Sequence, residues 1–340
     1  MNASGIRCDN DIKIAQNLLN HMLVQRVKEQ VDREAEKGPM GMRRRLLSTS
    51  VRLSRSMSPT VHKMADHCIE KLGVDLPLEL YAYASPQFNA ACFKPEEGRL
   101  FVMFSSGLLE AFDDNELMFV VGHEFGHHVY QHHDMPVGYI LNGTQRPSAN
   151  LALQLFAWTR YAEISADRAG AFCANDLEAV AKALFKLASG LTSNRIVSFN
   201  LSEFLHQLDE MQATDAEPGQ GAPMEDWFST HPFSPLRVKA LQLFHQSGLM
   251  LPGGIEKAEL ELHVQGMLGM MEPDYLEGHT DVAKKMRLLF IAGAVAVANA
   301  RAGISEREAS VLKEFMGEEF SLCLLYTSDA ADDRRGGLWS

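Results

Sequence analysis

The chain has 340 residues and a formal net charge of -12, with 32 basic against 44 acidic side chains. This length is enough for two domains, or for one large domain with an appendage. Hydrophobic residues make up 46% and charged residues 22%, as in soluble globular proteins, and the acidic balance argues against nucleic acid as the main partner.

The cysteines and the apolar segments bear on the cellular location of the protein. The five cysteines are scattered, odd in number and without CxxC spacing, which fits a reducing compartment and gives no support for a cysteine–zinc site. The first 16 residues lack the apolar core of a signal peptide. The most apolar segment, 288–300, is too short for a bilayer core of about 30 Å. We therefore expect a cytoplasmic protein without an integral membrane segment.

Residues 1–55 are expected to form an N-terminal helical extension. Apolar and charged residues alternate at helical spacing over 11–37, and Gly38-Pro39 ends the pattern. A basic patch follows, which is either a solvated face or a site for an anionic partner or membrane surface. Its members are Arg43, Arg44, Arg45, Arg52 and Arg55.

A small sheet is expected next. Residues 60–72 fit a helix, and 78–83, 88–93 and 99–104 fit strands, with a turn at 95–98. We predict a short antiparallel sheet whose exposed edge strand could add an extended peptide through main-chain hydrogen bonds.

The sequence His123-Glu124-Phe125-Gly126-His127 is the central motif. It lies in a predicted helix that Asp113, Asp114 or Asn115 can cap. Residues four apart on a helix lie nearly above one another, so both imidazoles can reach one metal ion. Glu124 lies one step round the helix, within reach of a water on that metal, as in the HExxH pattern of zinc peptidases.

Two neighbouring features leave alternatives open. Gly122 and Gly126 flank the ligands, and glycine costs about 1 kcal/mol inside a helix, so they indicate close packing or substrate approach. The histidines that follow are expected to be exposed helix-end residues rather than ligands, with a second metal site as the alternative. They are His128, His132 and His133.

A second helix, predicted over 152–174, carries Glu163 and Asp167 on one face. Two carboxylates in an apolar setting are costly unless they bind something. Glu163 is therefore the predicted third zinc ligand, and Asp167 the acceptor that orients a ligand imidazole. The alternative is a helix salt bridge with Arg160 or Arg168.

The segment from 177 to 246 supplies a further histidine. Another helix is expected over 177–190, and a flexible acidic loop over 213–226. His231 precedes a proline, so we place it in a loop before a helix that runs to Gln246.

Taken together, the ordered motifs resemble the gluzincin peptidases of the CAAX-prenyl endopeptidase and HtpX type, over about residues 55–245. The matching features are Asn89-Ala90, Ser106-Gly107-Leu108-Leu109, HEFGH at 123–127, EISAD at 163–167 and the THP with a following arginine at 230–237. The transmembrane helices usual in that family are missing, as in its soluble members.

The resemblance implies a role for each matching residue. Zinc would be bound by His123, His127 and Glu163, with one ion per chain. The other implied residues are Glu124 as general base, Asp167 as the orienting acceptor, His231 and Arg237 as transition-state support, and Asn89 and Ala90 on the strand that binds substrate.

The C-terminal part is expected to be separate. Residues 265–320 include a stretch, 300–308, that resembles the helical TerB-like module of tellurite-resistance proteins, here truncated, and would dock a partner. Residues 323–340 match neither a helix nor a core pattern and are predicted to be a non-native tail.

The predicted fold is α+β and mainly α-helical. It consists of a zincin-like peptidase domain over 56–250, with a small antiparallel sheet beside the HExxH helix, and a C-terminal helical module. The predicted function is a zinc metalloendopeptidase that hydrolyses protein or peptide substrates. The alternative is a zinc-stabilised, non-catalytic interaction protein that acts through its C-terminal helices.

Overall fold

The computed structural model describes residues 2–36, 38, 41–192, 196–215 and 224–272, with 289 and 293 as isolated residues. The chain divides into two compact units, Met1–Glu272 and Pro273–Ser340. From residue 273 onward the predicted module lies outside the described residues except for 289 and 293, and the whole predicted tail lies outside them. Most of the predicted acidic loop, 216–223, also lies outside them.

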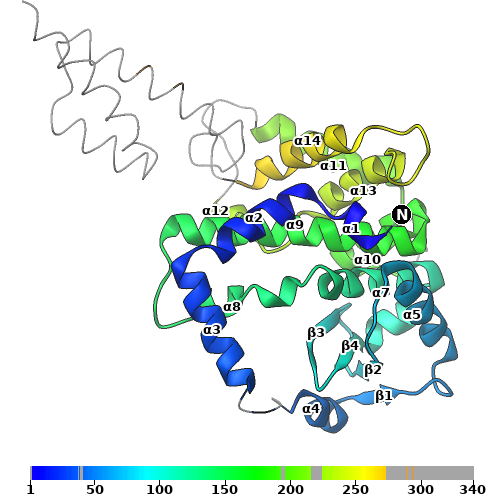
Figure 1. Ribbon diagram of the computed structural model, residues 1–340. Coiled ribbons are helices and arrows are strands. Elements are labelled where there is room, and N and C mark those ends of the chain that lie inside the picture. The colour runs from blue at the N-terminus through cyan, green and yellow to red at the C-terminus, as the bar shows by residue number, and fades with distance from the viewer. Residues whose placement is uncertain are drawn as a thin grey trace, which may run out of the picture. The chain divides into compact units, whose positions relative to one another are not determined.

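The first unit is mainly helical and carries one sheet (Figure 1). Its N-terminal elements are α1 (Ala3–Ile6), α2 (Asp9–Leu19), α3 (Met22–Glu36), α4 (Met42–Thr49) and α5 (Pro59–Leu72). The strands are β1 (Val51–Leu53), β2 (Leu78–Tyr83), β3 (Ala90–Glu96) and β4 (Arg99–Ser105). After the sheet come α6 (Ser106–Ala111), α7 (Asp114–Val129), η1 (His132–Asp134), α8 (Val137–Leu141) and α9 (Ala149–Ala174). The last elements are α10 (Leu177–Ser189), α11 (Leu201–Asp215), α12 (Met224–Trp227), α13 (Ser234–Gln246), α14 (Lys257–Leu268) and η2 (Gly269–Met271).

The N-terminal extension contains two helices where one was predicted over 11–37. The break falls after Leu19, because the His21 ring accepts a hydrogen bond from Leu23 N (3.2 Å) and so starts a new helix. The apolar faces of α2 and α3 pack in a cluster with Leu155 and Trp158 of α9. The N-terminal segment is thereby part of the same compact unit as the central helices.

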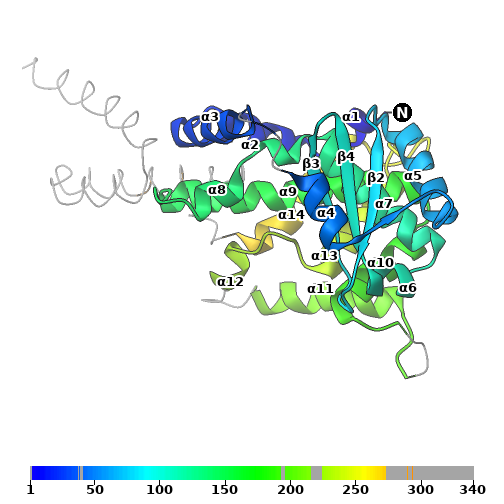
Figure 2. The same ribbon diagram turned by 90° about the horizontal axis from the view of Figure 1, so that it is seen from below.

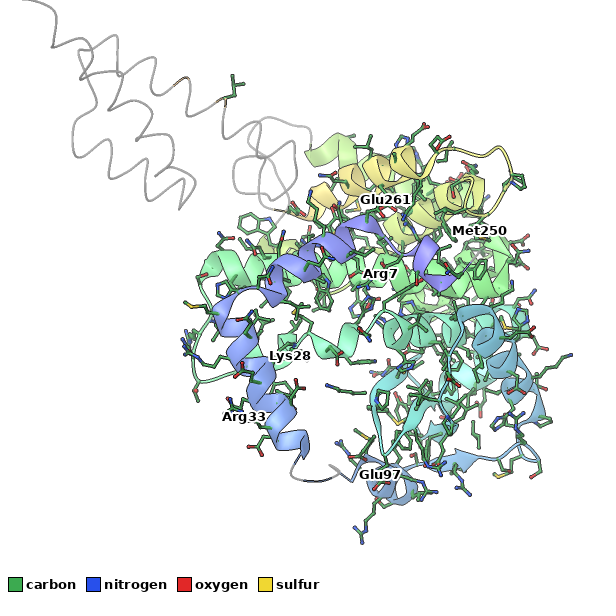
Figure 3. All side chains as sticks on the ribbon, in the orientation of Figure 1. Arg7, Lys28, Arg33, Glu97, Met250 and Glu261 are labelled. Carbon is green, nitrogen blue, oxygen red and sulfur yellow. The ribbon has the colours of Figure 1, made fainter. Side chains whose placement is uncertain are left out.

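The sheet has the order β1-β2-β4-β3 and is mixed. The predicted strands over 78–83 and 99–104 are confirmed, but β2 and β4 run parallel, so the prediction of a purely antiparallel sheet was wrong. The physical reason is that β4 is one of two inner strands and is buried on both faces, with Phe101 in one apolar cluster and Val102 in another, as is usual for strands paired in parallel. The β3–β4 hairpin, whose turn holds Glu97 (Figure 3), brings β4 back beside β2 and leaves β3 at the edge.

Two arginines of the predicted basic patch are engaged in ion pairs. Arg43 Nε donates to Glu79 Oε1 (2.9 Å), and Arg55 Nη1 donates to Asp66 Oδ2 (2.7 Å). These contacts favour the interpretation of a solvated face for those two residues. Among the described helices, none is both long and apolar enough to cross a bilayer.

Among the described elements, α7 and α9 share the most extensive packing. α7 packs on α9 on one side and contacts β3 on the other (Figures 1 and 2). A Cβ at Gly122 would lie 2.9 Å from Gly170 Cα, and one at Gly126 would lie 3.0 Å from Ala166 Cα. A Cβ at Gly170 would meet Phe119 O at 2.5 Å. Close packing with α9 is therefore the reason for Gly122 and Gly126, the two glycines beside the ligand histidines.

We expect Gly170→Ala to destabilise the protein by about 1–3 kcal/mol, because the added methyl meets backbone that cannot move without parting the helices. Gly266→Ala in α14 is the matched control, because a Cβ there meets nothing within 4 Å. The control should be neutral or stabilising by up to about 1 kcal/mol. Urea denaturation measures both, and equal effects would contradict the packing argument.

Candidate metal centre

The first ligand helix, α7, begins at a complete capping box. Asp113 Oδ1 accepts from the backbone N of Asn115 and Glu116 (both 3.0 Å), and Glu116 Oε2 accepts from Asp113 N (2.8 Å). Lys186 Nζ donates to the same buried Glu116 carboxylate (2.6 Å). Of the three predicted N-cap candidates, Asp113 is the residue that caps the helix, and it fixes where the helix starts and so which residues face α9.

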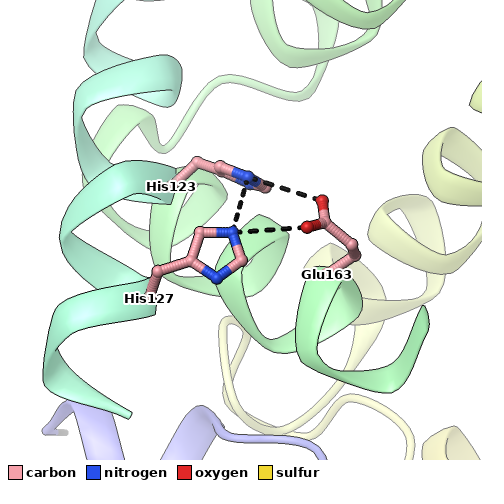
Figure 4. Close-up of side chains that lie close together, drawn as sticks. All are labelled: His123, His127 and Glu163. Atoms are coloured by element: carbon pink, nitrogen blue, oxygen red, sulfur yellow. Dashed lines mark hydrogen bonds and ion pairs between the residues drawn. The ribbon is translucent and has the colours of Figure 1, made fainter. Parts of the chain in front are cut away.

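Three side chains from α7 and α9 point at one position (Figure 4). His123 Nε2 lies 3.2 Å from His127 Nε2 and 3.6 Å from Glu163 Oε2, and His127 Nε2 lies 3.4 Å from Glu163 Oε1. Zinc bonds of about 2.0–2.1 Å in tetrahedral geometry place two ligand atoms about 3.3 Å apart. The three donors therefore have the spacing of a zinc site.

The chemistry of this donor set also fits a cation. Glu163 Oε2 is buried and accepts no hydrogen bond from the described residues, which is costly for a carboxylate oxygen. His123 Nε2 and Arg237 Nη2 lie 3.6 and 3.7 Å from it, beyond hydrogen-bond distance. Burial by itself would raise the pKa of Glu163, but His127 and His123 hold that pKa well below its usual range. Within the described part of the chain, His123, His127 and Glu163 are the group of three that converges closely enough to hold a metal ion.

Asp167 lies behind His123. Its Oδ1 accepts from His123 Nδ1 (2.9 Å), which leaves Nε2 of that ring free of a proton and turned toward the site. Burial by itself would raise the pKa of Asp167, but Arg237 and His123 lower that pKa. Arg237 Nε and Nη2 donate to the two Asp167 oxygens at 2.8 and 2.6 Å.

The alternative of a salt bridge along α9 is not observed. Arg160 Nη1 donates instead to the backbone oxygen of Trp227 (3.0 Å), and Arg168 Nη1 to Glu261 Oε1 (2.6 Å). Both carboxylates of the EISAD segment are thus directed toward α7 and α13 rather than toward their helix neighbours.

Glu124 lies between the triad and the sheet. It is largely buried, and its Oε2 accepts a hydrogen bond from Cys92 N of β3 (2.7 Å). The Cys92 amide therefore points away from β4, toward the free edge of the sheet. This bond holds the Glu124 carboxylate beside the metal ligands and against the edge strand.

His231 reaches the same site from the loop after α12. Its Nε2 lies 3.5 Å from Glu163 Oε1, its ring shares a hydrogen bond with Thr230 Oγ1 (2.8 Å), and its side chain is 62% exposed. The exposed ring is free to turn toward a bound molecule, whereas Arg237 is buried against Asp167.

The prediction that the histidines after the motif are exposed was wrong. Gln131 adopts a left-handed conformation (φ 59°) that ends the helix and turns the chain back, so His132 folds under His127. His132 is 7% exposed, and burial lowers its pKa. His128 and His133 are half-buried.

The two ring nitrogens of His132 contact a ligand histidine and a buried carboxylate. Its Nδ1 lies 2.9 Å from His127 Nδ1, and its Nε2 lies 3.0 Å from Asp11 Oδ2. Asp11 lies 121 residues away in α2, so no local spacing could have revealed it. The sequence signal for His132 was its place in the histidine cluster that follows the motif, five residues after His127.

A cleft of about 570 Å³ adjoins the triad. Its lining includes His127 and Glu163, Val31 of α3, Lys94 of β3 and Trp158 of α9. The cleft therefore joins the candidate metal site to the edge strand and to the N-terminal helices.

The site and fold agree with the comparisons with known proteins. Residues 56–244 match peptidase family M48, and the chain belongs to this family of metallopeptidases. It is 29% identical over 181 residues to the plastoglobule-localized metallopeptidase 48, chloroplastic, of Arabidopsis thaliana. That alignment covers 51% of this chain and 52% of the relative, so the match spans about half of each protein. No solved structure matches the chain.

The family assignment confirms part of what the sequence predicted. A mainly helical α+β peptidase fold and membership of a metallopeptidase family are shown. The CAAX-prenyl endopeptidase or HtpX subtype, the TerB-like module and the cytoplasmic location stay predictions.

We expect Arg237→Leu to lower the free energy of unfolding by about 3–5 kcal/mol, because it leaves the buried Asp167 carboxylate without its main counter-charge. Arg55→Leu is the control, because it breaks an exposed ion pair with Asp66 and should cost at most about 1 kcal/mol. Urea denaturation of both variants measures the difference. A loss at Arg237 no larger than at Arg55 would contradict this role.

Proposed function

We propose that the protein is a zinc-dependent metalloendopeptidase that hydrolyses peptide bonds in protein or peptide substrates. The observation that carries the proposal is the convergence of His123, His127 and Glu163 at zinc-site spacing, with the Glu124 carboxylate held beside them. Three protein ligands leave a fourth position for water or substrate, as in catalytic zinc sites. The ion would supply a water of lowered pKa and would polarise the scissile carbonyl.

Glu124 is the proposed general base. Its carboxylate takes the proton from the attacking water and then delivers it to the leaving amine. The Cys92 amide that holds Glu124 Oε2 restricts the side chain to one orientation, which leaves Oε1 for the proton transfer.

The proposed substrate-binding strand is β3. Both main-chain groups of Asn89 bond to β4 and are not available to a substrate. Its O accepts from Ser105 N (2.9 Å), and its N donates to Ser105 Oγ (3.1 Å). Main-chain groups alternate in direction along an antiparallel strand, so Ala90 shares the outward direction of Cys92. An extended peptide would pair with Ala90 at this edge and pass the triad, with side chains entering the adjoining cleft.

His231 is the proposed donor to the oxyanion of the transition state. The 3.5 Å distance between its Nε2 and Glu163 Oε1 supports this role, and such donors are worth about 3 kcal/mol. For Arg237 we propose a positioning role, because it donates to both Asp167 oxygens. Its Nη2 also lies 3.7 Å from Glu163 Oε2, so it acts on the site through the Asp167 and Glu163 carboxylates.

Glu124→Gln should retain one zinc ion per chain and lose activity by about 10²–10⁴-fold, because the amide cannot accept the proton. Zinc is measured by atomic absorption, and cleavage with a peptide library, each with and without a chelator. Retained cleavage in this variant would rule out the base. Zinc binding without any cleavage by the unaltered protein would instead favour the interaction-protein alternative.

His231→Ala should reduce kcat by about 10²–10³-fold with little change in KM, because an oxyanion donor acts only in the transition state. His206→Ala is the control, since this α11 histidine has the same 62% side-chain exposure and lies outside the site. Steady-state kinetics on a peptide substrate separates the two constants. Equal kcat values for the two variants would remove His231 from the mechanism.

A further inference from the structure

The two imidazoles of the candidate centre are supported in different ways. His123 Nδ1 donates directly to the Asp167 carboxylate. His127 Nδ1 instead faces the ring nitrogen of another histidine, His132 (2.9 Å). Ligand histidines ordinarily donate their second ring N–H to a carboxylate, carbonyl or water, and that partner fixes the tautomer. The support of His127 therefore needs its own explanation.

The contact to Asp11 determines where the protons lie. An ionised carboxylate can only accept, so His132 Nε2 carries a proton and donates to Asp11 Oδ2 (3.0 Å). In a neutral ring the other nitrogen is then an acceptor, so His132 Nδ1 accepts from His127 Nδ1. The His127 ring is thereby left with an unprotonated Nε2 that points at His123 and Glu163.

Asp11 itself is a fixed, fully buried anchor. Its Oδ1 also accepts from Trp158 Nε1 (3.0 Å) and Arg7 Nη2 (3.0 Å), and its Oδ2 accepts from Arg7 Nε (2.7 Å). Burial by itself would raise the pKa of Asp11, but the hydrogen bonds from His132 and Arg7 hold that pKa well below its usual range. A buried carboxylate with its lone pairs satisfied is held in one orientation.

We propose that Asp11 and His132 are positioning residues of the metal centre, and that the chain Asp11–His132–His127 holds His127 in its metal-binding tautomer. Asp11 lies in α2, outside the segment 56–244 that matches the peptidase family. The N-terminal helices are then part of the metal centre rather than an appendage. This inference rests on the proposed zinc site but not on peptide hydrolysis.

A purely structural role is the competing explanation, because the same contacts also hold α2 against α9. Two variants of His132 separate the roles. The Asn side chain places an acceptor oxygen where Nδ1 lies, whereas Gln places its amide nitrogen where Nε2 lies. His132→Asn therefore keeps the bond to His127, and His132→Gln keeps only the bond to Asp11. His132→Phe fills the space and keeps neither.

The test is the zinc dissociation constant of the full chain, measured by competition with a chromophoric chelator. His132→Phe should bind zinc about 10–100-fold more weakly, as for other losses behind a metal ligand. His132→Asn should recover most of that loss, and His132→Gln should recover little. The comparison of zinc affinity between His132→Asn and His132→Gln, with Asn expected to bind more tightly, can be made even if His132→Phe does not fold.

The matched control is Tyr130→Phe. It removes the hydrogen bond from Tyr130 Oη to Ala3 O (2.9 Å), which also joins the N-terminal segment to the end of α7, and it leaves the chain to His127 intact. It should lower the unfolding midpoint and leave the zinc dissociation constant unchanged.

Three results would overturn the inference. They are an equal or reversed order of the Asn and Gln variants, unchanged zinc affinity in a folded His132→Phe variant, and a loss of affinity in Tyr130→Phe that matches the loss in His132→Phe. A protein that binds zinc with the expected order but cleaves no peptide would refute the proposed peptidase and leave this inference standing.

Discussion

The close contact of α7 and α9 is the constraint on which the site depends. A carboxylate side chain is short, so Glu163 can reach both His123 and His127 only where the two backbones nearly touch. Gly122, Gly126 and Gly170 provide this approach, since a Cβ at each would lie within 3.0 Å of an atom of the facing helix. Each glycine destabilises its helix by about 1 kcal/mol relative to alanine. In return, the two helices can pack closely enough for the three side chains of the triad to meet.

The same contact concentrates charged side chains in a buried region. Glu163, Asp167, Arg237 and Asp11 are all buried, and isolated charges in such a place cost several kcal/mol each. Each is therefore paired with a group from a distant part of the chain, as Asp167 is with Arg237 of α13. Glu163 differs, because its Oε2 lacks a hydrogen bond from the described residues and has Arg237 Nη2 only at 3.7 Å, and the proposed zinc ion would supply the closer positive charge.

Local patterns were sufficient for those parts of the structure that local physics decides. Helical spacing predicted that His123 and His127 share a face, and the capping residues predicted where α7 begins. The apolar alternation of 78–83 predicted a strand, but not the parallel direction of β2 and β4, because strand direction depends on how a hairpin folds back and not on the residues of the strand. The break between α2 and α3 was missed for a related reason, since it depends on a side-chain cap by His21 within an otherwise continuous apolar pattern.

Contacts that depend on the tertiary fold could not be predicted. The carboxylates of Glu163 and Asp167 carried a signal because they stand in an apolar helix. Asp11 carried none, since an aspartate near the start of an amphipathic helix is an ordinary surface residue in most sequences, and His132 was noted only as one of the histidines after the motif that were predicted to be exposed. Only the left-handed turn at Gln131 and the packing of α2 on α9 bring them to the site.

The segment matched by the family and the physical unit that makes the metal centre are therefore different in extent. His123 is supported by Asp167 and Arg237, all within residues 56–244. On the proposed chain of hydrogen bonds, His127 depends on α2, which lies before that segment. Metal binding and the docking of α2 then stabilise one another, because a ligand that prefers the docked state shifts the equilibrium toward it by its difference in affinity. In this proposal the N-terminal helices have two roles: α3 lines the cleft, and α2 contributes to the affinity of the site for the metal ion.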